Sequence, residues 1–264
     1  MALFGSNKQE TKSITKVKPT VVKTQNVAKE LMAIAKSYDI KVDSLDFNIF
    51  EVWTYTRMYD GSRETEWEEI SRDELYELDD ESALLNPEFQ IKQTYEIEVF
   101  SKNVEEDLYA DLKLAVGANA TKCKVYLSIG AGSSVTYNPR FEQDLLVLIN
   151  KRKLRAGILI YIFDEMLNDV VSKIAAHVRV QETAVYEQSE TILIAESYEA
   201  TLTTDDEMIL HYDKKEDIDE NQKIDYSSRG FIKNVKKDEL LIEYVKAKEG
   251  KPGRNCRGEF MKLQ

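Results

Sequence analysis

The chain has 264 residues, 42% of them hydrophobic, and its 36 Lys and Arg residues against 48 Asp and Glu give a net charge of −12 at pH 7. This length allows one large domain or roughly two to three small ones, and the composition is typical of a globular protein. The negative charge argues against a general nucleic-acid binder, because it repels phosphate groups. We expect a cytoplasmic protein, since no run of about 20 apolar residues occurs and the first residues lack the apolar core of a secretory signal.

Few residues in the chain have the spacing of a chemical site. Cys123 and Cys256 lie far apart and form no C-x-x-C pair, so we expect buried thiols rather than a redox or zinc site. His177 and His211 have no companion ligand at metal-site spacing. No set of residues matches a catalytic arrangement, and the sequence therefore predicts a protein that is not an enzyme and uses neither a cofactor nor a metal.

The N-terminal part is predicted to contain a disordered, Lys-bearing arm over residues 1–20 and a helix plus β-hairpin module over residues 21–90. The helix begins near Thr24 or Asn26, either of which can cap it. Its apolar residues recur at the spacing of one helical face, at Val27, Leu31, Ile34 and Tyr38.

The hairpin of this module is predicted from alternating residues and a turn signal. Residues 45–55 alternate as a strand does, and Asp60-Gly61 supplies a tight turn. The return strand should include Trp67 and Ile70. We therefore expect a long hairpin packed on the first helix.

An acidic block follows the turn. Asp60 to Glu81 contains eleven acidic and two basic residues, and Ser71 with Glu74 has the spacing of a helix capping box. A block of this kind is either a solvated face or a surface that attracts a basic partner. The candidate partner surface consists of Glu64, Glu66, Glu68, Glu69, Asp73 and Glu74.

Residues 91–223 are predicted to form a central α/β module. Its expected elements are a strand with Tyr95, Ile97 and Val99, a helix capped by Asn103 and Glu106 with Leu108, Leu112 and Val116 on one face, a strand from Cys123 to Ile129, a helix that opens at Asn138-Pro139 and ends at Gly157, a strand from Ile158 to Phe163, and a helix that begins at Asp164. Only short strands are expected after about residue 178. This change of element type predicts a further domain that starts near residue 224.

Two short elements near the C-terminus form a pattern together. The first reads I-D-Y-x-x-R-G and the second G-K-P-G-x-x-C-x-G, and the glycines and the proline of the second element favour a sharp, defined turn series. The pattern resembles that of the flagellar assembly protein A family, although Cys256 stands where that family more often has an aliphatic residue. The matching residues are Ile224, Asp225, Tyr226, Arg229, Gly230, Gly250, Pro252, Gly253 and Gly258.

The resemblance is strongest over residues 224–260, and its implications for fold and function are specific. It implies that residues 224–264 are the start of a right-handed parallel β-solenoid, which the chain enters without completing, within an α+β protein. It also implies a non-enzymatic adaptor or scaffold that takes part in bacterial flagellar assembly, or in placement at the cell pole, by binding other proteins. A homo-oligomer is compatible with this interpretation.

Two other functions stay open on the sequence alone. Gly130–Ser134 follows a predicted strand, and its backbone amides would be able to approach a phosphate in a nucleotide-dependent enzyme. The Lys-rich arm and the basic C-terminal end would together suit an RNA-binding module. The basic residues at that end are Lys246, Lys248, Lys251, Arg254, Arg257 and Lys262.

Overall fold

The computed structural model describes residues 16–59, 61, 65–71, 73–74, 81–103, 107–211, 238 and 240–262. These contain both helices and strands, which confirms the α+β class. The chain divides into two units, each compact in its own contacts: unit 1 comprises residues 1–199 and 253–262, and unit 2 comprises residues 200–252 with the last two residues. None of the helices in the described ranges is long and apolar enough to span a bilayer.

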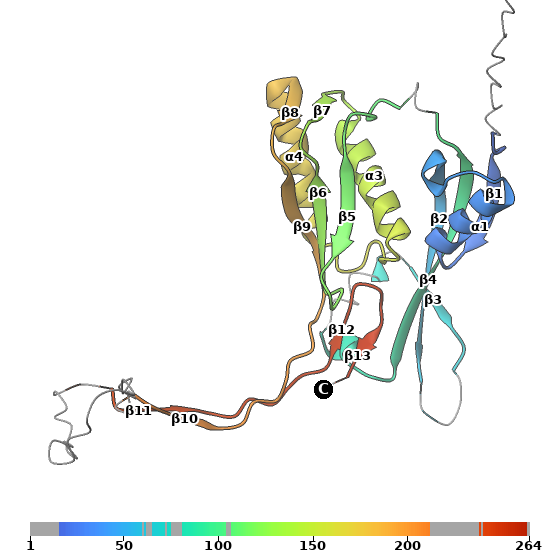
Figure 1. The fold of residues 1–264 in the computed structure, drawn as a ribbon. Helices are drawn as coiled ribbons and strands as arrows, with labels where there is room; N and C mark the ends of the chain where they lie inside the picture. Colours follow the sequence, from blue (N-terminus) through green and yellow to red (C-terminus); the bar gives the residue numbers. More distant parts are fainter. Residues whose placement is uncertain are drawn as a thin grey trace, which may run out of the picture. The chain divides into compact units, whose positions relative to one another are not determined.

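The first sheet of unit 1 is antiparallel and is ordered β1-β4-β2-β3 (Figure 1). Its strands are β1 (Thr20–Thr24), β2 (Leu45–Met58), β3 (Glu68–Ile70) and β4 (Phe89–Ser101), and α1 (Val27–Ser37), the short η1 (Val42–Ser44) and α2 (Glu81–Leu84) accompany them. The predicted helix is confirmed. β2 and β3 pair as an antiparallel hairpin, but only over Thr54–Thr56 with Glu68–Ile70. Residues 57–67 separate the paired positions, so the predicted long hairpin with a tight turn at Asp60-Gly61 is wrong, and Trp67 lies just before the return strand. The predicted boundary at residue 90 falls inside β4.

This sheet carries one of the two cores of unit 1. Alternate residues of β2 and β4 point to the same face, where Leu45, Phe47 and Ile97 are fully buried against α1. Asn26 caps α1, because its Oδ1 accepts a hydrogen bond from the Lys29 amide at 2.9 Å. The predicted cap is thus present. Val27 and Leu31 of the predicted apolar face are buried and Ile34 packs beside them, whereas Tyr38 lies at the C-cap and is exposed.

The second sheet is ordered β5-β6-β9. Strands β7 and β8, which lie between β6 and β9 in the sequence, form a separate two-stranded sheet. The strands are β5 (Leu114–Ala118), β6 (Lys124–Ile129), β7 (Ser133–Thr136), β8 (Thr183–Tyr186) and β9 (Glu190–Glu196), and the helices are α3 (Phe141–Arg155) and α4 (Leu167–Gln181). Helix α3 lies between the two sheets, contacting β5 and α1 (Figure 1). It contributes to both cores, since Phe141 and Ile149 pack in one and Leu154 packs in the other.

The helix predicted from Asn103 to Val116 is wrong. Residues 107–112 form turns, and Leu114–Ala118 is strand β5, which pairs with β6 from Leu114↔Ile129 to Ala118↔Val125. The spacing of Leu108, Leu112 and Val116 imitates a helical face, but pairing with the buried β6 outweighs that local pattern. Leu108 is largely exposed as a result.

The strand predicted from Ile158 to Phe163 is also wrong. The segment is buried, but it has no regular structure, because Tyr161 (φ 67°) and Phe163 (φ 62°) adopt left-handed backbone conformations. At Ile160, the side chain of Gln93 makes the backbone hydrogen bonds that a neighbouring strand would otherwise make. The Gln93 carboxamide donates to Ile160 O (2.8 Å) and accepts from Ile160 N (3.1 Å). An apolar run of this length therefore signals burial without specifying strand geometry.

The described residues of unit 2 form a ribbon of two antiparallel strands, β10 (Glu207–Leu210) and β11 (Ile242–Val245), which run side by side (Figure 1). Isolated bridges at Thr204↔Lys248 and Thr201↔Lys251 extend the pairing. The hairpin of β12 (Gly253–Arg254) and β13 (Phe260–Met261) belongs to unit 1. All strand pairings given for the described residues are antiparallel, so the parallel solenoid is not confirmed. The predicted boundary at residue 224 lies outside the described residues, and the four-part domain division stays a prediction.

Candidate functional site

The last part of the second family element, residues 253–258, forms a sharp turn packed into unit 1. Gly258 has a φ of 81°, and a Cβ at this position would lie 2.8 Å from Ile91 Cγ2 and 3.1 Å from Leu159 Cδ1. Both the backbone conformation and the space therefore require glycine. The Asn255 Oδ1 accepts from the amides of Arg257 (3.0 Å) and Glu259 (3.1 Å), which fixes the turn.

Arg254 anchors this turn in the core. Its side chain is 1% exposed, has no carboxylate partner among the described residues, and donates to four backbone carbonyls. The acceptors are Leu84 O (2.7 Å), Gly258 O (2.7 Å), Phe89 O (2.7 Å) and Asn86 O (3.1 Å). Burial lowers the pKa of Arg254 to about 10. The prediction that Arg254 belongs to an exposed basic end is therefore wrong.

Cys256 completes the packing of the turn. It is buried, its amide donates to Lys122 O (2.9 Å), and its carbonyl accepts from Leu159 N (3.0 Å). Cys256 and Cys123 are both free thiols, as predicted, and burial raises the pKa of Cys256 to about 11. Cys256 thus fills the position as a small apolar residue would.

The remaining residues of the family pattern are described only in part. Gly250 lies in unit 2, where its amide donates to Thr203 Oγ1 at 3.1 Å, and Pro252 is half-buried. The first element, Ile224, Asp225, Tyr226, Arg229 and Gly230, lies outside the described residues.

The predicted acidic surface is exposed where the structure describes it. Glu66, Glu68, Glu69, Asp73 and Glu74 are exposed, and Glu64 lies outside the described residues. The two hydrogen bonds of the capping box are confirmed, because Ser71 N donates to Glu74 Oε2 (2.6 Å) and Glu74 N donates to Ser71 Oγ (3.3 Å). Most of the short helix that the box was predicted to cap lies outside the described residues. The hydrogen bond from the Ser71 backbone amide holds the pKa of Glu74 below its usual value. Binding of a partner here stays a prediction.

Residues 130–134, which the sequence suggested as a phosphate-binding loop, lead from β6 into β7. Residues 130–132 connect the two strands, and Ser133 and Ser134 are the first residues of β7, so a strand and not a helix follows. Each backbone amide of residues 130–134 already donates to an acceptor in the protein. A phosphate cradle needs free amides, usually at a helix N-terminus, so this loop lacks the geometry as folded. The acceptors for Gly130, Ala131, Gly132, Ser133 and Ser134 are, in order, Lys113 O (2.9 Å), Ser189 Oγ (3.0 Å), Tyr186 O (2.7 Å), Gly130 O (3.1 Å) and Asp111 O (3.2 Å).

Ionic groups inside unit 1 are paired in ways that position the backbone. Lys153 is fully buried and bonds to Asp164 Oδ1, while Asp164 Oδ2 accepts from Tyr161 N at 2.8 Å. Burial raises the pKa of Asp164, and the Lys153 ammonium opposes that shift. Within the described ranges, no group of three or more His, Cys, Asp and Glu side chains is placed to hold a metal ion.

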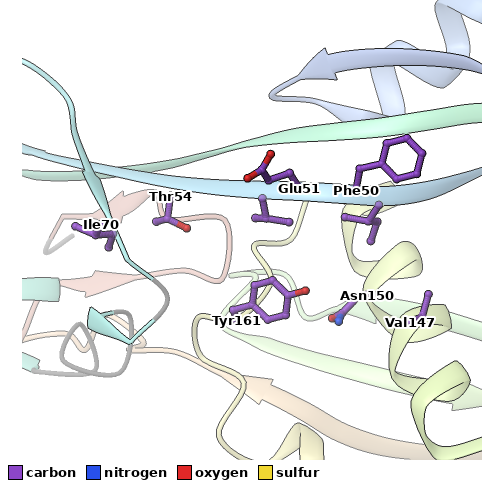
Figure 2. Close-up of a pocket in the computed structure, with 9 residues that line it drawn as sticks. Phe50, Glu51, Thr54, Ile70, Val147, Asn150 and Tyr161 are labelled. Atoms are coloured by element: carbon purple, nitrogen blue, oxygen red, sulfur yellow. The ribbon is translucent and has the colours of Figure 1, made fainter.

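Sequence reasoning did not find the pocket between β2 and α3, which we call the β2–α3 pocket. It has a volume of about 290 Å³ and is lined by Ile49, Phe50, Glu51, Val52, Thr54, Ile70, Val147, Asn150 and Tyr161 (Figure 2). A β-bulge at Phe50 interrupts the β2–β4 register beside it. No pattern in the sequence relates Asn150 on α3 to the bulge on β2.

The β10–β11 ribbon has two different faces. The register pairs Met208 with Tyr244 and Leu210 with Ile242, so these four side chains lie on one face. We call this the apolar ribbon face. The opposite face carries Glu207, Ile209, Glu243 and Val245.

Comparison with known proteins places the chain in a family. The family model described as the flagellar assembly protein A N-terminal region matches residues 116–264, which is more than half of the chain. The chain belongs to the flagellar assembly protein A family. No curated protein and no solved structure matched it.

In this flagellar assembly protein A family member, the family match begins within β5 and includes both the turn anchored by Arg254 and the β10–β11 ribbon. The first sheet lies wholly before the matched residues. The β2–α3 pocket therefore joins residues outside the match, such as Ile49 and Ile70, to Asn150 and Tyr161 within it.

Proposed function

We propose that this chain is a non-enzymatic scaffold that serves flagellar assembly in the bacterial cytoplasm by binding other proteins. Membership of the flagellar assembly protein A family supports the assembly role. Placement at the cell pole, and a parallel β-solenoid as the scaffold's further architecture, are parts of this proposal. The binding surface that we assign is the apolar ribbon face.

The observation that carries the proposal is the exposure of this face. Met208, Leu210, Ile242 and Tyr244 are 40–62% exposed, although all four are large and apolar or aromatic. A ribbon of only two strands is marginally stable alone in water, and clustered exposed apolar groups mark interaction sites. A partner that covers the face would bury these side chains and stabilise the ribbon.

The ribbon is already organised for such a contact. Asp206 accepts two hydrogen bonds of 2.6 Å, one from the Tyr244 hydroxyl and one from the Ala247 amide. Among the described residues, β10 and β11 pair only with each other, which leaves backbone edges to which a partner strand can be added. A preformed surface loses less conformational entropy on binding than a flexible one. This arrangement favours docking of an extended or apolar protein segment.

A matched pair of substitutions tests the proposal. Ile242→Lys places a charge on the apolar ribbon face, and Val245→Lys places the same charge on the opposite face of the same strand. In a flagellated bacterium that carries this chain, we expect Ile242→Lys to reduce the number of flagella per cell and Val245→Lys to leave it near normal. Equal effects of the two variants, at equal protein levels, would contradict the proposal.

A further inference from the structure

The β2–α3 pocket contains a buried acceptor that the protein itself does not use. Asn150 is only 5% exposed, and its Oδ1 has no hydrogen-bond partner in the part of the chain that the structure describes. Figure 2 shows its carboxamide and the Tyr161 hydroxyl pointing toward each other beneath β2. Because a buried acceptor without a donor is costly, this end of the pocket suits a ligand that supplies one.

Apolar side chains form part of the pocket wall, beside polar ones such as Thr54. Ile49 and Val52 come from β2, Ile70 from β3 and Val147 from α3. The volume of about 290 Å³ lies just under the range of roughly 300–1,000 Å³ that small-molecule pockets occupy. A single side chain therefore fits better than a nucleotide. The chemistry that matches is a hydrogen-bond donor at the end of an apolar stem.

The same stretch of β2 can receive an extended protein segment. β3 pairs only with Thr54–Thr56, so the β2 residues that precede Thr54 pair with β4 alone among the described strands. Phe50, at the bulge, is 54% exposed beside this edge. An open strand edge next to a side-chain pocket is the arrangement used when a peptide adds to a sheet.

Charge determines which donor is favoured. Glu51 lies at the pocket, with its carboxylate on the opposite side of β2 from Tyr161 (Figure 2), and Glu68 and Glu69 precede Ile70 on β3. These carboxylates attract cations over the screening distance of about 8–10 Å, and the chain as a whole carries −12.

We propose that the β2–α3 pocket takes a lysine side chain from a basic, extended segment of a protein partner. The methylenes would lie against Ile49, Val52 and Val147, and the ammonium would donate to Asn150 Oδ1. Lysine fits better than arginine, because a compact ammonium on a four-carbon stem suits a narrow pocket that ends in one carboxamide oxygen. This site is separate from the apolar ribbon face, so its test does not depend on the proposed function.

Two peptides that differ only in the end of one side chain test this proposal. Acetyl-Thr-Lys-Thr-amide and its norleucine counterpart are titrated into the full chain, while the side-chain amide of Asn150 is followed by NMR. We expect a saturable shift with the lysine peptide and binding roughly tenfold weaker with norleucine. Asn150→Leu should weaken binding of the lysine peptide by about the same factor, whereas Gln143→Leu, exposed on the same helix, should not change it.

Three results would overturn the proposal: equal affinity for the two peptides, no saturable shift with the lysine peptide, or binding that Asn150→Leu leaves intact. If Asn150→Leu does not fold, the comparison of the two peptides on the unsubstituted chain still decides.

Discussion

Arg254 Nε donates a hydrogen bond of 2.7 Å to the carbonyl of Leu84, 170 residues earlier in the chain. This bond and the bond to Phe89 O tie the C-terminal family turn to the segment that leads into β4. The turn is therefore an integral part of unit 1, in which its arginine satisfies four backbone carbonyls.

Loss of the Arg254 guanidinium should destabilise unit 1. Arg254→Met keeps the apolar stem but removes the donors for four carbonyls, and unsatisfied buried acceptors cost about 1–3 kcal/mol each. We expect a loss of about 3–5 kcal/mol in the free energy of unfolding in urea, a size similar to that for breaking a buried charged network. Arg257→Met is the control, because Arg257 is exposed and makes one such bond, to Ala156 O. A similar loss of unfolding free energy in both variants would show that the buried hydrogen bonds of Arg254 contribute no more to stability than the single bond of the exposed Arg257.

Gly258 is expected to tolerate no Cβ. Gly258→Ala combines a left-handed backbone with a contact of 2.8 Å to Ile91 Cγ2, so the free energy of unfolding should fall by about 2–4 kcal/mol. Gly117→Ala, on β5, meets nothing within 4 Å and should change stability by less than about 0.5 kcal/mol. Thermal and urea unfolding measure both. A neutral Gly258→Ala would mean that the turn is not packed as described.

The ribbon should lose order in acid through Asp206. The Tyr244 hydroxyl, and then the Ala247 amide, hold the pKa of Asp206 below its ordinary value of 3.8. A lowered folded-state pKa means that the contribution of these bonds is fully present above the ordinary value and is lost as pH falls through the lowered one. The Asp206 side-chain carbon, followed by NMR, should titrate below pH 3.8, together with the β11 amide shifts. Asp206→Asn should abolish this acid transition of the β11 shifts, whereas Asp205→Asn should preserve it.

The loop at residues 130–134 should not bind nucleotides, because its amides are already used. Calorimetry with ATP and GTP should give no saturable heat. Ser133→Ala removes the acceptor of the Lys113 amide (3.1 Å), so it should lower the free energy of unfolding by about 1–3 kcal/mol, as expected for a structural residue. Saturable nucleotide binding that Ser133→Ala abolishes would instead support the enzyme alternative.

Local signals in the sequence were sufficient where one element accounts for its own structure. Helix α1 has both a cap at Asn26 and a helical apolar period, and Ser71 with Glu74 forms the predicted capping box. Local signals were insufficient where residues distant in the sequence determine the backbone conformation. The four-residue spacing from Leu108 to Val116 predicted a helix, but the partner strand β6 fixes an extended backbone.

The candidate sites show the same limit. Burial of Arg254 depends on carbonyls of residues 84–89, which nothing near the arginine in sequence reveals. Asn150 likewise becomes part of a pocket only because α3 packs beside the β2 bulge. The apolar ribbon face could be recognised only from the strand register, because the pairing of Met208 with Tyr244 is what places the apolar side chains together.

Site-specific photo-crosslinking tests the central claim most directly. A photoreactive amino acid replaces Ile242 on the apolar ribbon face in one strain and Val245 on the opposite face in another. We predict that position 242 crosslinks a flagellar assembly component in growing cells, that position 245 does not, and that the crosslink disappears when Met208→Lys is added. Crosslinks of equal yield from both positions, or none from position 242, would contradict the assignment of this face as the docking surface.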